Sequence, residues 1–145
     1  MKYHRQLCLH DPANDSYGDC QRTAIACLLD KESPLDVPNY AELYWDDPDK
    51  FGSAFRGYLR TQGYDWVGLP YLGTGMSPKE FLCWAGNYCD QYYMVSGMGA
   101  RGVGHVVIAK GKSFCHDPHP SDDYLVGPFD DGVYWIYLIL AILPN

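Results

Sequence analysis

Apolar residues follow a helical period in the first half of the chain. Between positions 19 and 31, Cys20, Ala24, Cys27 and Leu28 recur at i, i+4, i+7 and i+8, and Lys31 follows at i+11, which is the spacing of one helix face. Asp19 suits the N-cap, and Pro34 ends the segment because a proline cannot continue the hydrogen-bond ladder. The pattern predicts a helix over 19–31 with Cys20 in its first turn.

Two further stretches have helical features. Phe51, Phe55, Tyr58 and Leu59 recur at helical spacing before Gly63. These positions predict one or two short helices over 40–62. Ser77 and Pro78 then supply the polar cap and the proline that open a helix, which we expect to run through Trp84.

The second half is dominated by β-branched and aromatic runs between Gly, Pro and Asp clusters. They predict a short strand over 64–69 and further strands over 92–95, 103–109, 113–116 and 133–142. Residues 134–140 are apolar at successive positions, so we expect a central strand covered on both faces. Helices followed by an antiparallel sheet predict a single α+β domain over 1–145.

Composition narrows the class of protein. Eleven Lys and Arg oppose 18 Asp and Glu, a net charge of −7 without a basic cluster, so we expect no nucleic-acid partner. With 47% hydrophobic residues the chain has material for a core. The first eight residues lack a secretory apolar stretch, and residues 133–143 fall short of the roughly 20 that a spanning helix needs. We therefore expect a cytoplasmic protein without a membrane segment, whose six cysteines remain thiols.

One pair of residues is predicted to form an orienting hydrogen bond. The runs on either side of Lys110-Gly111-Lys112 suit a hairpin with a three-residue loop. A loop centred on Gly111 places His105 directly opposite Asp117, with Cβ atoms about 4.5–5.5 Å apart. An imidazole held by a carboxylate is half of a device that activates a nucleophile.

Cys20 is the candidate for the other half. At a helix N-terminus its sulfur meets the partial positive charge of unpaired amides, and a protonated His105 would stabilise its thiolate further. The neighbouring carboxylate of Asp19 repels a thiolate, so we expect the histidine to supply most of the activation. We interpret Cys27, on the same helix, as a core residue.

The same features in the same order resemble a known family. Gly18-Asp19-Cys20 opens a helix with small residues at Ala24 and Ala26, Gly104-His105 begins an apolar run, and Asp117-Pro118 follows. This arrangement is similar to the papain-like cysteine peptidases, within them the C39-like branch. The resemblance implies a papain-like α+β fold in which an N-terminal helix carrying the nucleophile packs on a C-terminal antiparallel sheet.

The resemblance also implies roles. Cys20 would be the nucleophile, His105 the general base and acid, and Asp117 the orienting member, with no cofactor and no metal. In that family a Gln about six residues before the nucleophile donates to the oxyanion, and here Asn14 stands at that position. Residues 116–121 resemble uncharacterised bacterial and phage-type sequences, which implies a bacterial or infected-host cytosol.

The expected function is cysteine-dependent hydrolysis of an amide or peptide bond in a peptide or protein substrate. Deamidation and transglutaminase-like exchange use the same triad and stay open. A non-catalytic module that binds a peptide or a protein on this fold is an alternative from another class. A zinc site of Cys8, His10 and His119 is a third, although no Cys-x-x-Cys supports it.

Overall fold

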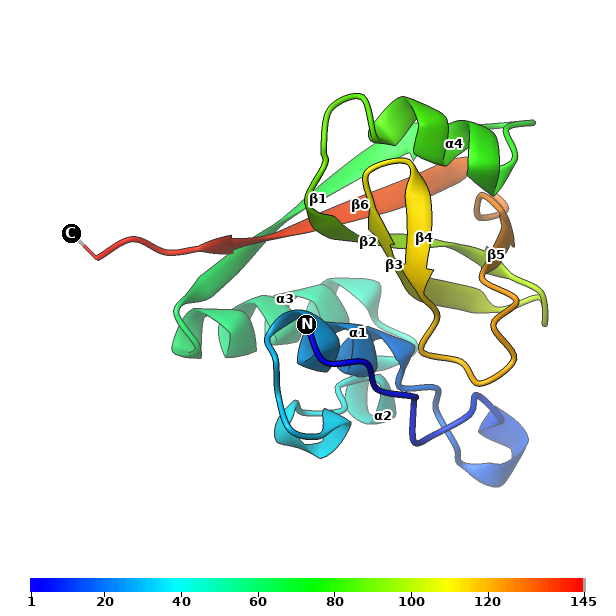
Figure 1. Cartoon of the computed structure of the whole chain (residues 1–145). Coiled ribbons are helices and arrows are strands. Elements are labelled where there is room, and N and C mark those ends of the chain that lie inside the picture. The colour runs from blue at the N-terminus through cyan, green and yellow to red at the C-terminus, as the bar shows by residue number, and fades with distance from the viewer. Residues whose placement is uncertain (145) are drawn as a thin grey trace. The chain divides into compact units, whose positions relative to one another are not determined.

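Six antiparallel strands and several helices make up residues 1–144, which the computed structural model describes (Figure 1). The α+β class is as predicted. The strands are β1 (Tyr64–Leu72), β2 (Tyr92–Gly99), β3 (Gly104–Lys110), β4 (Ser113–His116), β5 (Leu125–Gly127) and β6 (Val133–Ala141). The helices are α1 (Cys20–Leu28), α2 (Ala41–Tyr44), α3 (Pro48–Thr61) and α4 (Pro78–Ala85), with 3-10 turns η1 (Pro12–Asn14) and η2 (Pro34–Asp36). None of these helices combines the length and apolar character that a bilayer crossing requires.

The chain divides into two compact units. The first contains Met1–Val67 and the chain from Ile139 onward, and the second contains Gly68–Leu138. The strands are hydrogen-bonded in the order β1-β6-β2-β3-β4, and β5 pairs separately with β2. The predicted central strand, β6, is therefore internal in the sheet. It is not covered on both faces as predicted, because buried and partly exposed residues alternate from Val133 to Ile136 and the strand end at Leu140 and Ala141 is exposed. Strand β2 has three partners. Short β5 was not predicted, because three residues are too few for an alternating pattern to appear.

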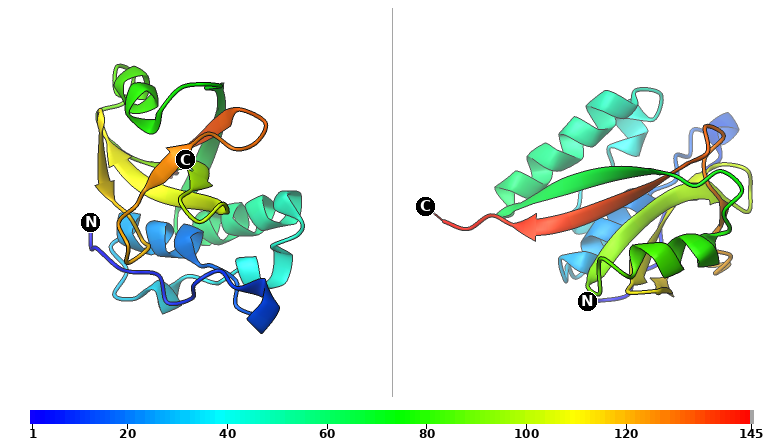
Figure 2. Two further views of the ribbon diagram at one scale, coloured as in Figure 1. Left: turned by 90° about the vertical axis from the view of Figure 1, so that its right-hand side faces the viewer. Right: turned by 90° about the horizontal axis from the view of Figure 1, so that it is seen from above.

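The core of the second unit lies between α4 and one face of the sheet, and Figure 2 shows helix α4 beside the strands. Val95 pairs with Val107 and Tyr93 with Ala109, so these side chains share a face. The buried members of the core come from five elements: Phe81, Leu82 and Ala85 of α4, Tyr93 and Val95, Val107 and Ala109, Leu125, and Tyr134 and Ile136. Helix α4 begins as predicted, with a capping box in which Ser77 and Glu80 bond each other's backbone N–H groups.

Helix α1 is buried on every side in the first unit. Residues 21–27 are all buried, including the polar ones. The helix ends earlier than predicted: Asp30 adopts a left-handed conformation (φ 54°) and the N–H of Lys31 donates to the carbonyl of Ala26 at 2.9 Å. This six-to-one bond closes the helix end, so the helix ends before Pro34 is reached.

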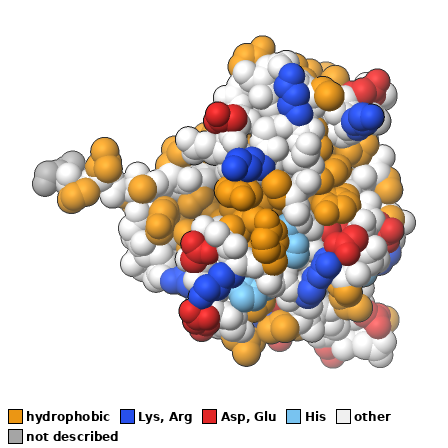
Figure 3. Space-filling view, in the orientation of Figure 1, with side chains coloured by type: hydrophobic (Ala, Val, Ile, Leu, Met, Phe, Trp, Pro, Cys, Tyr) orange, Lys and Arg blue, Asp and Glu red, His pale blue; other side chains and the backbone are white. Residues whose placement is uncertain are grey.

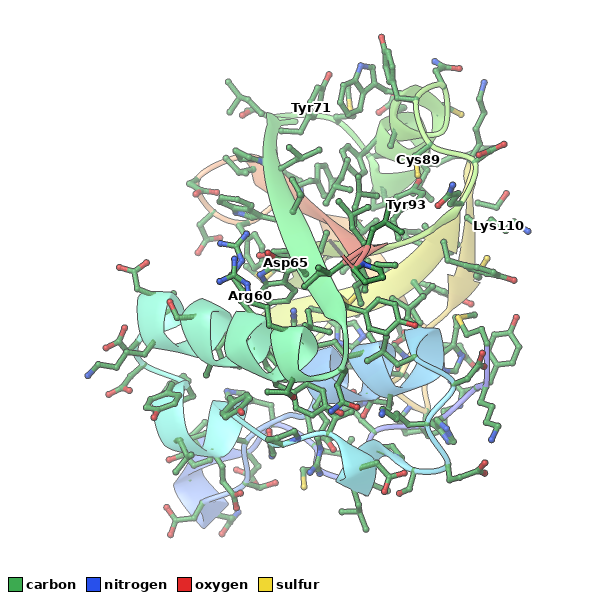
Figure 4. All side chains as sticks on the ribbon, turned by 90° about the vertical axis from the view of Figure 1, so that its left-hand side faces the viewer. Arg60, Asp65, Tyr71, Cys89, Tyr93 and Lys110 are labelled. Carbon is green, nitrogen blue, oxygen red and sulfur yellow. The ribbon has the colours of Figure 1, made fainter. Side chains whose placement is uncertain are left out.

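An ion-pair cluster joins α3 to the start of β1 (Figure 4). Asp65 accepts from Arg56 Nε at 2.8 Å and from Arg60 Nη2 at 2.9 Å. Gly63 turns the chain between the two elements at φ 82°, which favours glycine. The predicted helices over 40–62 are α2 and α3.

Apolar side chains also reach the surface. On the face seen in Figure 3 they alternate with acidic and basic side chains, and neither charge gathers into one large patch. The large apolar residues that are more than half exposed include Leu7, Leu35, Leu43, Trp45, Leu72, Tyr88 and Leu143. Single exposed apolar residues are ordinary on a protein surface.

The Asp65 cluster predicts a pH dependence of stability. Hydrogen bonds from Arg60 and Arg56 lower the pKa of Asp65 from 3.8 to about 2. Because the folded-state pKa is depressed, the contribution to stability is complete above pH 3.8 and is lost as the pH falls toward 2. We expect Asp65→Asn to flatten the dependence of the unfolding free energy on pH in this window, measured by urea denaturation.

The control is Asp90→Asn, which changes an exposed carboxylate that forms no ion pair within residues 1–144. This variant is expected to keep the acid slope of the wild type. Equal slopes for wild type and Asp65→Asn would contradict the assignment.

Candidate active site

His105 and Asp117 form a buried pair in the second unit. His105 Nε2 lies 2.6 Å from Asp117 Oδ1, and the two residues are 3% and 0% exposed. The predicted hydrogen bond between these two side chains is therefore present. A carboxylate so deeply buried requires donors around it, since an unpaired buried charge is costly.

Backbone N–H groups of the loop after β4 complete the surroundings of Asp117. The N–H of His119 donates to Oδ1 and that of Tyr124 to Oδ2, each at 2.8 Å. Burial alone would raise the pKa of Asp117, but the hydrogen bond and charge of His105 and these two N–H groups hold the pKa below its ordinary value. The carboxylate is therefore ionised near neutral pH.

An ionised Asp117 determines the tautomer of His105. The carboxylate can only accept, so Nε2 must carry the proton that lies in the 2.6 Å bond. In the neutral ring, Nδ1 is then the basic nitrogen. A thiol that used this imidazole as its base would have to approach Nδ1.

The turn between β3 and β4 differs from the predicted one. Lys110 pairs with Ser113, so the connection has two residues rather than three, and the predicted register is wrong. Counted from this turn alone, Asp117 would lie on the opposite face of the hairpin from His105, because side chains alternate along a strand.

A bulge in β4 restores the face of Asp117. The ladder shifts by one residue between Ile108 and Ala109, so that Ile108 pairs with His116 and the extra residue in β4 is Cys115. Because one inserted residue reverses the alternation, Asp117 returns to the face of His105. The pair was therefore predicted correctly from a wrong loop length.

The glycine-rich segment before β3 lies against His105. A Cβ added to Gly99 would lie 3.1 Å from Cβ of His105, so only a glycine allows this close approach without a shift. Part of this segment belongs to β2, and residues 100–103 form the turn that leads into β3.

Cys20 belongs to the first unit, where it is the first residue of α1, as predicted. Its exposure is intermediate, whereas Cys27 on the same helix is fully buried. Burial raises the pKa of the Cys27 thiol, whose sulfur accepts from the N–H of His4 at 3.3 Å. Cys27 is a core residue, as predicted, and Cys20 is the more accessible thiol of the helix.

The carboxylate of Asp19 does not cap α1. Asp19 occupies the N-cap position, but its side chain makes no capping hydrogen bond to the backbone of the helix, which corrects the predicted role. Its oxygens accept from the N–H of Cys8 at 2.9 Å and from Arg22 Nε and Nη2 at 3.0 and 2.8 Å. Arg22 is itself buried and compensates the negative charge beside Cys20, so the expected repulsion of a thiolate is reduced.

Asn14, the predicted oxyanion donor, lies in η1 and is exposed. Its Nδ2 donates to Asp11 Oδ2 at 2.7 Å. An isolated bridge between Asp11 and Ser16 closes residues 11–16 into a loop, and Asn14 lies within this loop.

Because the loop of residues 11–16 closes on itself, Gln6, which precedes the loop, lies beside the start of α1, which follows it. Gln6 Nε2 donates to the carbonyl oxygen of Cys8 at 2.8 Å, and this oxygen also accepts from the N–H of Asp19 at 3.2 Å. Gln6 Oε1 is buried and has no hydrogen-bond partner within residues 1–144. Gln6 was not predicted, although the turn-forming residues 11–16 are a signal that the flanking segments meet.

The histidines and cysteines that the sequence offered for a zinc site are not grouped into one. Within residues 1–144 no three His, Cys, Asp or Glu side chains are placed so that they could hold a metal ion, and the six cysteines are free thiols. His119 instead donates its N–H to Asp117.

No family model, curated protein or solved structure shows significant similarity to the chain. The case for a function therefore depends on the geometry of its own residues.

The donor set of Asp117 predicts a large effect on stability. Asp117→Ala removes the buried acceptor of three donors, the His105 ring and the N–H groups of His119 and Tyr124, and we expect a loss of about 2–4 kcal/mol in the unfolding free energy. Asp117→Asn keeps one acceptor oxygen, and its loss should be smaller. Urea denaturation near neutral pH measures both.

Asp123→Ala serves as the control because its carboxylate is about half exposed and lies 3.8 Å from Arg101. Its effect should stay within about 0.5 kcal/mol. Similar losses of unfolding free energy for Asp117→Ala and Asp123→Ala would show that Asp117 contributes no more to stability than an exposed carboxylate does.

Proposed function

We propose that this protein is a cysteine-dependent hydrolase with a papain-like arrangement that cleaves an amide or peptide bond in a peptide or protein substrate. Cys20 is the nucleophile, His105 the base and acid, and Asp117 the orienting residue. The observation that carries the proposal is the buried 2.6 Å bond between His105 Nε2 and Asp117 Oδ1, which leaves Nδ1 as the basic nitrogen. The proposal requires the Cys20 thiol to reach that nitrogen.

The chemistry follows from these roles. His105 Nδ1 takes the proton of the Cys20 thiol, and the thiolate attacks the carbonyl carbon of the substrate. The carbon–nitrogen bond breaks as His105 returns the proton to the leaving amine, and a thioester with Cys20 remains. Nδ1 then takes a proton from water, whose oxygen attacks the thioester and releases the acid and the thiol. An ammonia leaving group makes the reaction a deamidation, and an amine in place of water makes it a transfer.

Burial of Asp117 suits this role. Each time His105 becomes positively charged, the ionised carboxylate stabilises the imidazolium, and the loop N–H groups keep the carboxylate ionised. Compensation of Asp19 by Arg22 supports the role of Cys20 in the same way, because it limits repulsion of the thiolate.

Gln6 joins Asn14 as a candidate for the oxyanion donor. One hydrogen of Gln6 Nε2 is engaged with the Cys8 carbonyl, so the second is available, and the Asp19 N–H on that same carbonyl places the amide beside the start of α1. The single Asn14 bond to exposed Asp11 ties that side chain to its own loop. We therefore assign the oxyanion contact to Gln6, with the N–H of Cys20 as the second donor.

Alkylation tests the nucleophile without a known substrate. We expect iodoacetamide near pH 7 to modify Cys20 at least about tenfold faster than exposed Cys83, because only thiolate reacts. His105→Ala should remove this preference. Peptide mass spectrometry after timed quenching gives the rate at each cysteine within one sample.

Cys83 is the internal control in every variant, and His4→Ala is the matched histidine control in the first unit. Were Cys20 to react at the rate of Cys83 in the wild type, or equally fast in wild type and His105→Ala, the proposed mechanism would be wrong.

Hydrolysis of p-nitrophenyl acetate tests the oxyanion donor, since acylation passes through a tetrahedral oxyanion. Gln6→Ala should lower the acylation rate by about tenfold or more, and by more than Asn14→Ala does. Release of p-nitrophenol in the first turnover measures the step. A larger loss for Asn14→Ala would return the assignment to Asn14.

A non-catalytic binding module is the second candidate. A three-ring cluster in the first unit favours it: the ring centroids of His10 and Tyr17 lie 5.5 and 5.6 Å from that of Trp45, which is half exposed. Exposed aromatic rings are common in peptide-binding surfaces. An unreactive Cys20 together with saturable quenching of tryptophan fluorescence by peptides would support this alternative.

A further inference from the structure

A second group of polar side chains lies beside the His105–Asp117 pair, within the same unit. Arg101, in the turn between β2 and β3, has its Nη1 at 3.3 Å from both His119 Nδ1 and Ser121 Oγ. The ring centroids of His105 and His119 are 6.2 Å apart. The guanidinium is therefore held close to the imidazole that the proposed function uses as its base.

His119 anchors Arg101 as a neutral ring. Its Nδ1 accepts from the N–H of Ser121 at 3.1 Å and lies 2.8 Å from Ser121 Oγ. Since Nδ1 faces donors, the proton of the neutral ring belongs on Nε2. Burial and the charge of Arg101 both lower the pKa of His119, so the positive charge of this group belongs to Arg101.

One edge of the guanidinium remains open. Nη1 makes both hydrogen bonds of Arg101 and lies 3.8 Å from Asp123 Oδ2, whereas Nε and Nη2 have no acceptor within residues 1–144. The side chain is 37% exposed. Nε and Nη2 form the fork that binds a carboxylate through two parallel hydrogen bonds. Arg101 is thus fixed at one end and presents an unused bidentate donor at the other.

We propose that Arg101 binds a carboxylate of the substrate and is a specificity-determining residue for the reaction. This inference rests on the proposed function. An extended peptide advances about 3.3 Å per residue, so the guanidinium is within reach of a group one or two residues from the scissile bond. The carboxylate is either an Asp or Glu side chain or the free C-terminus of a peptide. Asp123 competes with it for Arg101.

Two alkylating reagents of similar size test the inference. Iodoacetate carries the carboxylate and iodoacetamide does not, so the ratio of their rates at Cys20, relative to the same ratio at Cys83, reports the anion site. We expect Arg101→Gln to lower this ratio by about fivefold to tenfold. Asp123→Asn should raise the ratio because it removes the competing carboxylate.

Lys112→Gln is the matched control, since it removes an exposed cation from the turn between β3 and β4 and should leave the ratio unchanged. High salt should lower the wild-type ratio by screening the charge. An equal ratio in wild type and Arg101→Gln, or an equal fall in Lys112→Gln, would overturn the inference.

Peptides distinguish the two sources of the carboxylate. Protection of Cys20 from iodoacetamide by acetyl-Ala-Glu-Ala-amide, weakened in Arg101→Gln, identifies an acidic side chain as the recognised group. Protection by acetyl-Ala-Ala-Ala with a free C-terminus, weakened in the same way, identifies the chain end. Protection no stronger than that by acetyl-Ala-Ala-Ala-amide contradicts recognition of either.

The two proposals fail in different ways. If the proposed function is wrong, the iodoacetamide rate at Cys20 does not depend on His105, and the inference falls with it. If only the inference is wrong, that dependence remains, while the ratio of iodoacetate to iodoacetamide does not respond to Arg101.

Discussion

A carboxylate taken out of water must be surrounded by donors, and the end of the β3–β4 hairpin is organised by that requirement. Asp117 receives the imidazole of His105 and two loop N–H groups, one on each side of the carboxylate. The loop after β4 is folded back on itself so that these amides converge. The same bonds that stabilise the loop also orient the imidazole, so structure and proposed chemistry depend on one buried charge.

Asp19 meets the same requirement in the first unit. It lies at the start of α1, yet its oxygens accept from the N–H groups of Leu7 and Cys8 and from the guanidinium of Arg22. The segment that carries Gln6 is therefore held against the residue that precedes Cys20. Asp19 and Asp117 are thus buried, compensated carboxylates, one in each unit, and each is adjacent to a residue of the proposed mechanism.

Much of this arrangement is readable from local pattern. Helix α4 has its cap and proline at Ser77 and Pro78, β4 has its predicted bounds, and Cys20 begins its helix. These features depend on neighbours within a few positions, which is the range over which propensity and capping act. The end of α1 was harder to predict from the sequence, because Asp30 takes the left-handed position that glycine usually occupies at a helix end.

The sequence by itself determined the α+β class, the starts of α1 and α4 and the pairing of one histidine with one aspartate. Only the tertiary structure decided how that pair forms, since the bulge at Cys115 depends on the ladder between two strands. It also decided that the charge of Asp19 is compensated. It further placed Gln6, which precedes the loop of residues 11–16, beside the start of α1, which follows that loop. The physical reason is that periodicity reports which side of an element is buried, whereas hydrogen bonds between distant segments depend on register and loop closure.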